Sequence, residues 1–128
     1  MNANETFARR VFFGAGVYGL LALLPQYFLE GRVARDFPPA ITHPEYFYGF
    51  IGVALAWQIA FLAIAKEPLR LRPVMIAAVL EKASFAASTL FLYQASRVAG
   101  VMVPFALIDL MLGTLFLISF FRCGNTEA

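Results

Sequence analysis

Three ionisable residues interrupt two long apolar runs, and packing alone does not explain them. Glu81 and Lys82 are the only charged residues between positions 73 and 96, and Asp109 is the only one between positions 98 and 121. A charge at the centre of a bilayer costs at least about 2.5–3.5 kcal/mol, so such residues are rare and usually functional. Carboxylates in this setting can hold a cation, carry protons or pair with a lysine.

Helical spacing predicts where these side chains point. At about 100° per residue, Glu81 belongs to a small and polar stripe that we expect to face the interior of the protein. The stripe consists of Ala77, Glu81, Ser84, Ser88 and Ala95. Lys82 is rotated toward a flank, and Asp109 lies between Ala106 and Gly113 on a small face of the next segment. A Lys82–Asp109 ion pair between antiparallel helices is therefore sterically reasonable, and the sequence leaves open whether Lys82 pairs with Asp109 or with Glu81.

Two interpretations of the charges remain open. In a structural one, Lys82 neutralises one acid, and Glu81 donates a hydrogen bond, as a neutral carboxylic acid, to Tyr18 or Gln58. In a functional one, Glu81 and Asp109 line a cavity, and the rings of Tyr18 and Trp57 form a cage for an amine. Three ionisable groups exceed what packing requires, which favours the functional interpretation. The predicted ligand-binding set is Tyr18, Trp57, Gln58, Glu81, Lys82, Ser84, Ser88 and Asp109.

The elements that must position these residues follow from the distribution of charge. Of the 128 residues, 61% are hydrophobic and only 14% are charged, whereas soluble domains carry about 25% charged residues. Residues 11–29 and 46–65 contain no charge, and about 20 apolar residues suffice to cross a bilayer as a helix. We predict an all-α integral membrane four-helix bundle with up-down-up-down topology. It forms a single transmembrane domain over residues 1–128, with helices at about 8–29, 43–65, 73–96 and 100–121.

A soluble helical core would need polar faces at helical spacing, and these segments lack them. The first segment has no small-x-small cleavage site, so we expect a retained helix and not a signal peptide. Basic residues favour the cytoplasmic side of a membrane. With both termini inside, the inner connections carry six basic residues and the outer ones three. We therefore expect both termini in the cytoplasm, and the bacterial cytoplasmic membrane as the location.

Local signals predict the ends and contacts of the helices. Thr42 and Glu45 have the spacing of a capping box for the second helix, and Pro73 suits the first turn of the third. Pro104, inside the predicted fourth helix, is expected to kink it toward a cavity. Small residues indicate where membrane helices touch. They are Gly14, Gly16 and Gly19 in the first helix, and Gly52, Ala56 and Ala60 in the second.

Several functional classes find little support. The net charge of +2 indicates no nucleic-acid partner. The single cysteine, Cys123, excludes an internal disulfide. His43 and Glu45 alone are a weak metal signal, and capping explains Glu45, so no metal and no cofactor are expected. A lone histidine also argues against a bis-histidine haem site.

The whole chain resembles small four-helix membrane proteins of bacteria. The resemblance rests on the stretch HPEYFYGFIGVALAWQ, on a proline-capped turn, and on one acid in each of the last two helices. The topology is similar to that of DoxX-like proteins, and more loosely resembles the group of the emopamil-binding protein, a sterol isomerase. The resemblance implies carboxylates, here Glu81 and Asp109, facing a pocket for a lipophilic and often cationic ligand. No second histidine accompanies the carboxylates, so isomerase activity is not carried over.

From these observations we expect a protein that binds a lipophilic small molecule, either neutral or cationic, or a membrane lipid. One alternative is a dimeric proton-coupled transporter in which Glu81 exchanges a proton for substrate. It ranks lower because small multidrug exporters carry their key glutamate in the first helix. A second alternative is an accessory subunit whose charges pair with a helix of a membrane-protein partner.

Overall fold

The computed structural model describes residues 2–127, and four long helices dominate it. They are α1 (Ala3–Leu23), α3 (Pro44–Lys66), α4 (Val74–Gln94) and α5 (Val103–Glu127). The shorter elements are the 3-10 helices η1 (Leu24–Phe28) and η2 (Gly100–Met102) and the helix α2 (Glu30–Asp36). Each long helix is apolar and long enough to cross a membrane. The predicted all-α class is confirmed. The four long apolar helices indicate an integral membrane protein.

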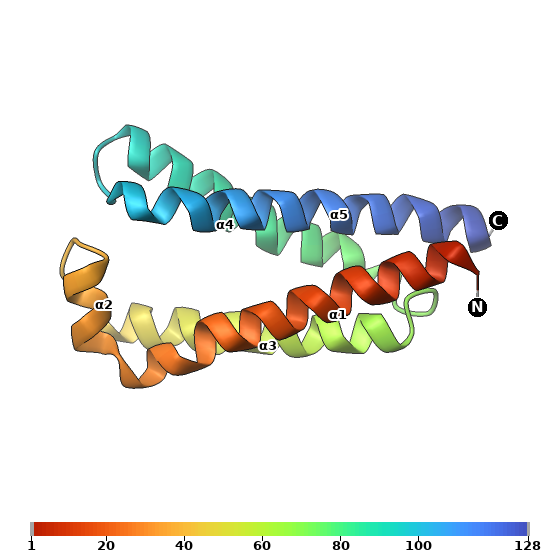
Figure 1. Cartoon of the computed structure of the whole chain (residues 1–128), viewed down its shortest axis with the longest axis horizontal. Coiled ribbons are helices and arrows are strands. Elements are labelled where there is room, and N and C mark those ends of the chain that lie inside the picture. The colour runs from red at the N-terminus through yellow and green to blue at the C-terminus, as the bar shows by residue number, and fades with distance from the viewer. Residues whose placement is uncertain (1, 128) are drawn as a thin grey trace.

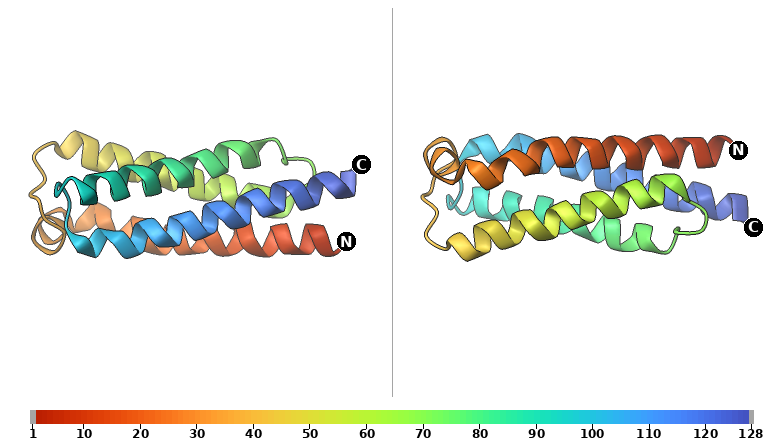
Figure 2. Two further views of the ribbon diagram at one scale, coloured as in Figure 1. Left: turned by 90° about the horizontal axis from the view of Figure 1, so that it is seen from above. Right: turned by 90° about the horizontal axis from the view of Figure 1, so that it is seen from below.

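The long helices alternate in direction, and both termini lie at the same end of the bundle (Figure 1). α1 packs along α3, and α4 packs along α5. α1 and α5 join these two pairs, whereas α3 and α4 pack against each other least. The pairs diverge toward the end that carries α2 (Figure 1), and Figure 2 shows α2 and the turn between α4 and α5 together at that end. The bundle is therefore closed at the end with the termini and splayed at the other.

Two helices are longer than predicted at the end with the termini. α1 begins at Ala3, not near residue 8, because Asn2 caps it: the Asn2 Oδ1 accepts a hydrogen bond from the Glu5 N–H at 2.9 Å. α5 continues to Glu127, past the predicted end at 121. Its last turns are held by Asn4, whose Oδ1 accepts a hydrogen bond from Arg122 Nε at 2.9 Å.

The start of α5 also differs from the prediction. η2 takes up residues 100–102, and α5 begins only at Val103. Pro104 therefore lies in the first turn, where its missing N–H breaks no helical hydrogen bond. The predicted kink toward a cavity is wrong.

The long connection between α1 and α3 contains a helix, α2, that the sequence did not predict. Tyr48 of α3 donates a hydrogen bond to Glu30 Oε1 at 2.9 Å and stacks on Tyr27, with ring centroids 6.0 Å apart. These contacts attach η1 and α2 to the start of α3. The predicted Thr42 capping box is wrong, because His43 occupies the N-cap position without a side-chain hydrogen bond. Pro73 occupies the N-cap position of α4, one residue before the helix begins.

Some of the small residues do mark helix contacts. A Cβ on Gly16 would meet Leu62, and a Cβ on Gly19 would overlap the side chain of Gln58. These two glycines therefore let α1 and α3 approach closely. Gly14 and Ala56 are exposed, so the prediction that they pack against another helix is wrong.

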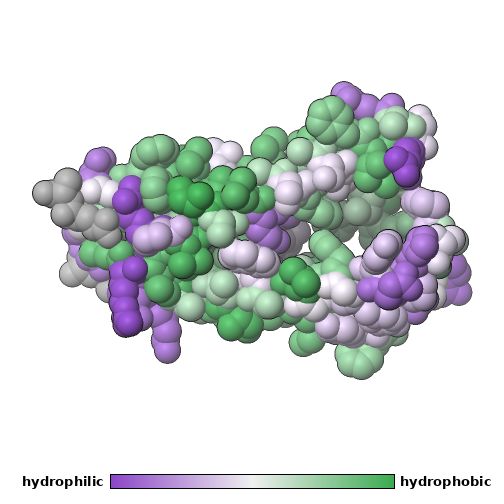
Figure 3. Space-filling view, turned by 180° about the vertical axis from the view of Figure 1, so that it is seen from behind, coloured by the Kyte–Doolittle hydropathy of each residue, from purple (hydrophilic) through white to green (hydrophobic). Residues whose placement is uncertain are grey.

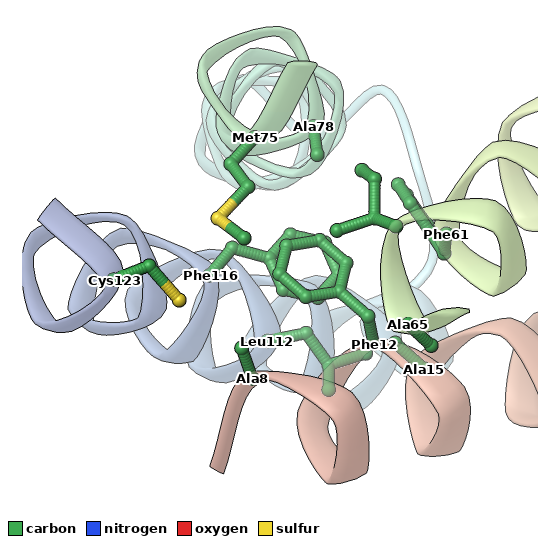
Figure 4. Close-up of a cluster of buried hydrophobic side chains, with 11 residues drawn as sticks. Ala8, Phe12, Ala15, Phe61, Ala65, Met75, Ala78, Leu112, Phe116 and Cys123 are labelled. Carbon is green, nitrogen blue, oxygen red and sulfur yellow. The ribbon is translucent and has the colours of Figure 1, made fainter. Parts of the chain in front are cut away.

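Three phenylalanines form the centre of the packed core, and all four long helices contribute to that core (Figure 4). The rings of Phe12 and Phe116 stack with centroids 4.1 Å apart, and Phe61 meets Phe116 edge-on at 4.9 Å. Met75 and Cys123 complete the core toward the termini. The remaining surface between the ends is rich in exposed apolar side chains (Figure 3), as expected for a surface that faces lipid.

Candidate functional site

Lys82 is buried between α4 and α5, with only 3% of its surface exposed. Its Nζ lies 3.4 Å from Asp109 Oδ1 and 3.7 Å from Glu81 Oε2. Gly113 makes room for it, since a Cβ at position 113 would lie 3.1 Å from the Lys82 Cβ. Of the two partners that the sequence left open, Asp109 is the nearer to Lys82, and Glu81 shares the same ammonium group. We call Glu81, Lys82 and Asp109 the ionic triad.

The rotation of α4 is the reverse of the predicted one. The buried face of the helix carries Lys82, together with Met75, Ala78, Ala86 and Thr89. Glu81 lies about 100° around the helix from Lys82, and Ser84 and Ser88 are exposed. The small polar stripe therefore does not face the interior of the bundle. Lys82 takes the inner position because it pairs there with Asp109, across a helix surface that Gly113 leaves open.

The ionic triad lies directly on the packed core. Lys82 Nζ is 5.3 Å from the centre of the Phe61 ring, and Phe61 is one of the three central phenylalanines. A cation near a ring face is attracted by the electron density of the ring. The triad thus marks the level at which the closed half of the bundle ends.

A groove of about 980 Å³ opens between α3 and α4, beside the ionic triad and toward the end of the bundle that carries α2. Figure 3 shows this face of the molecule hollowed between the two helix pairs, toward the end that carries α2. From α4, Glu81, Ser84, Phe85 and Ser88 line the groove, and from α3 its lining includes Trp57. The groove lies where the two pairs diverge, and the rings of Phe50 and Phe85 are the side chains that approach each other across it.

Four of the eight predicted site residues line this groove, namely Trp57, Glu81, Ser84 and Ser88. Asp109 and Lys82 form the ion pair beside it. Gln58 is buried against Gly19 of α1, and Tyr18 packs against the core. The structure therefore brings Glu81 and Trp57 to one groove, but it does not make Tyr18 and Trp57 opposite walls of one cage.

The hydrogen bond expected from Glu81 to Tyr18 or Gln58 is not formed. Gln58 Nε2 donates instead to the Ala54 carbonyl oxygen at 2.7 Å. Glu81 Oε2 and Gln58 Oε1 are both buried, and neither has a hydrogen-bond partner among residues 2–127. Glu81 Oε2 is therefore enclosed beside Lys82 Nζ, at 3.7 Å and without a hydrogen bond, while the exposed part of the Glu81 side chain lines the groove.

The apolar walls of the groove were not among the residues predicted from the sequence. Tyr46, Phe50 and Val53 of α3 line it together with Trp57. Their spacing of four, three and four residues places them on one helix face, so the pattern was visible in the sequence. It was not decisive, because a lipid-facing stripe has the same composition.

The charge of the triad determines what it can do chemically. Two carboxylates share one ammonium group, so the fully ionised triad has one negative charge in excess. The two carboxylates are similarly exposed, with 14% of the Asp109 side chain and 18% of the Glu81 side chain accessible, but Asp109 lies closer to Lys82 Nζ, at 3.4 Å against 3.7 Å. The excess charge can be balanced at Glu81 by a ligand cation or by a proton.

The start of α3 holds one further pair of potential ligands. His43 Nδ1 lies 3.0 Å from Glu45 Oε1 on the exposed surface. Within the part of the chain that the structure describes, no group of three His, Cys, Asp or Glu side chains could hold a metal ion.

No protein-family model, curated protein or solved structure matches this chain. The resemblance to DoxX-like proteins and to the emopamil-binding group therefore stays a prediction.

Proposed function

We propose that this protein binds a lipophilic cation, such as an amine with an apolar body, in the groove between α3 and α4. The single observation that carries the proposal is the position of Glu81, a carboxylate that lines an otherwise largely apolar groove with 18% of its side chain exposed. Ligand sites are typically apolar clefts with a few well-placed polar groups. Glu81 supplies such a group, and Ser84 and Ser88 supply hydroxyls farther along the same helix.

The shape of the groove favours an elongated ligand. Its α3 wall runs from Glu45 to Trp57, which corresponds to about 18 Å at the rise of an α-helix. Phe50 and Phe85 face each other across it, with ring centroids 6.1 Å apart. The cationic group would contact Glu81, and the apolar body would lie along the aromatic side chains toward Glu45.

Binding is favoured over transport by the position of the core. The rings of Phe12, Phe61 and Phe116 fill the bundle at the end with the termini, so one chain contains no continuous path past the triad. A transporter would need a second copy to build a path. We also propose that both termini lie in the cytoplasm of a bacterial cell, because six basic residues lie at that end and three at the other.

Thermal unfolding in mild detergent tests the binding proposal. A long-chain primary amine and the alcohol of the same chain length are compared below their critical micelle concentrations. Binding at a hundredfold excess over Kd stabilises the native state by about 2.7 kcal/mol, so we expect the amine to raise Tm by several degrees and the alcohol to have less effect. The Tm increase should be lost in Glu81→Gln.

Glu45→Gln is the matched control, because it makes the same chemical change at the mouth of the groove. The Glu45 side chain is 65% exposed, compared with 18% for Glu81, so a cation gains less from it. Equal responses to amine and alcohol, or an unchanged amine response in Glu81→Gln, would reject the proposal. Stable association of the free protein with a partner helix that covers the groove would favour the accessory-subunit alternative instead.

A further inference from the structure

A second cavity lies at the end of the bundle that carries the termini, apart from the groove and the triad. It has a volume of about 680 Å³. Thr6, Phe7, Arg10 and Val11 of α1 line it, and Arg122 of α5 lies on its other side. α1 and α5 pack side by side in the bundle, so two basic residues from different helices meet at one cavity. The proposed function makes no use of them.

The positive charge of this cavity is not balanced within the described residues. No described carboxylate lines it. The neighbouring Arg9 pairs with Glu5 at 4.0 Å, but neither Arg10 nor Arg122 pairs with a carboxylate among the side chains that the structure describes, at residues 2–126. Within that part of the chain, two guanidinium groups therefore converge on the cavity without a counter-charge.

Arg122 is held in place for binding by two contacts. Its Nε donates a hydrogen bond to Asn4 Oδ1 at 2.9 Å, and its guanidinium lies 4.3 Å from the centre of the Phe7 ring. Both contacts leave the terminal nitrogens of Arg122 available as donors. A guanidinium that is fixed in this way can bind a phosphate with two parallel hydrogen bonds at little entropic cost.

The depth of the two arginines identifies the kind of ligand. Arg10 directly precedes the charge-free run that begins at Val11, and Arg122 directly follows the apolar run that ends at Phe121. Both side chains thus belong at the boundary between the hydrocarbon and the headgroups. Phe7 and Val11 add an apolar surface beside them, which a free anion would not need.

We propose that this cavity binds the headgroup phosphate of an anionic phospholipid, with Arg10 and Arg122 as its ligands. Basic pockets between membrane helices bind such headgroups through the same chemistry. The lipid would lie against α1 and α5, with its glycerol and the start of its acyl chains on Phe7 and Val11. The proposal does not depend on the cation proposed for the groove.

The test is a lipid titration of the purified full-length protein in mild detergent, followed by native mass spectrometry and by Tm. The probes are phosphatidylglycerol, phosphatidylcholine, and inorganic phosphate as a free anion. We expect retention of phosphatidylglycerol, little effect of phosphatidylcholine, and no protection by inorganic phosphate at the same concentration. Affinity for phosphatidylglycerol should fall about fivefold for each arginine removed, and therefore about 25-fold in Arg10→Gln/Arg122→Gln.

Lys66→Gln/Arg70→Gln is the matched control, since it removes the same charge at the same end of the bundle but outside the cavity. If both double variants lose affinity equally, general surface charge explains the binding and the proposal fails. Equal protection by inorganic phosphate or by phosphatidylcholine would also overturn it. Should the Arg122 variant not fold, Arg10→Gln alone must still show the fivefold loss, because no described residue depends on the Arg10 side chain for a hydrogen bond or an ion pair.

Discussion

Replacement of Lys82 by methionine is the most direct perturbation of the ionic triad. Methionine keeps an unbranched side chain of similar length, so the packing against Phe61 and Gly113 is largely retained. The ammonium group is lost, however, and it lies 3.4 Å from Asp109 and 3.7 Å from Glu81. Two carboxylates would then remain close together without an opposite charge.

The expected cost is large. Removal of one partner from a buried ion pair destabilises a protein by about 3–5 kcal/mol, because an uncompensated charge stays buried. Neutral replacement of all three groups avoids that penalty, and such replacements are often close to neutral. We therefore expect Lys82→Met to be clearly less stable than the triple variant Glu81→Gln/Lys82→Met/Asp109→Asn, although the triple variant changes more residues.

Equilibrium unfolding in mixed micelles with increasing denaturing detergent measures these differences. Lys66→Met is the control, because Lys66 is exposed at the end of α3 and surface substitutions usually change stability by less than about 0.5 kcal/mol. If Lys82→Met is as stable as Lys66→Met, the Lys82 ammonium does not stabilise the bundle by pairing. The same conclusion follows if the triple variant is less stable than Lys82→Met.

Four further substitutions test the packing by the same unfolding measurement, and one of them also by proteolysis. Gly19→Ala should lower the free energy of unfolding by about 1–3 kcal/mol, since its Cβ would overlap Gln58. Gly14→Ala should raise it by about 0.5–1 kcal/mol, because a Cβ there meets nothing within 4 Å. A change of the same sign in both variants would contradict the close contact of α1 with α3 at Gly19. Phe116→Ala should lower the free energy of unfolding by about 3–5 kcal/mol. A loss smaller than that caused by alanine at an exposed phenylalanine would mean that Phe116 is not in the core. Tyr48→Phe should cost about 0.5–1.5 kcal/mol and speed proteolysis between α2 and α3, and unchanged proteolysis would mean that its hydrogen bond does not hold α2.

The sequence was sufficient to predict the four helices because charge is confined to their ends. The charge-free runs at 11–29 and 46–65 have no other plausible structure. The Lys82–Asp109 pair was also predictable as one of two alternatives, since small residues around Asp109 allow close approach of two adjacent antiparallel helices. These features depend on composition and on neighbouring segments of the chain.

The rotation of α4 was not predictable from its own residues. In a membrane helix the lipid-facing side and the buried side are both apolar, so periodicity hardly distinguishes them. The position of Lys82 depends on Gly113 in another helix, and the length of α5 depends on contacts with Asn4, 118 positions from Arg122. The groove likewise results from the divergence of two helix pairs, which no local pattern encodes.

Quenching of Trp57 fluorescence is the measurement that tests the central claim most directly. Trp57 is the only tryptophan in the chain, and it lines the groove with Glu81. A long-chain amine that carries bromine on its alkyl chain, and the alcohol of the same structure, would be titrated into wild type, Glu81→Gln and Glu45→Gln. We predict saturable quenching by the amine in wild type and in Glu45→Gln, and only weak, unsaturable quenching in Glu81→Gln. Equal quenching by amine and alcohol, unchanged by Glu81→Gln, would contradict a carboxylate-centred cation site in the groove.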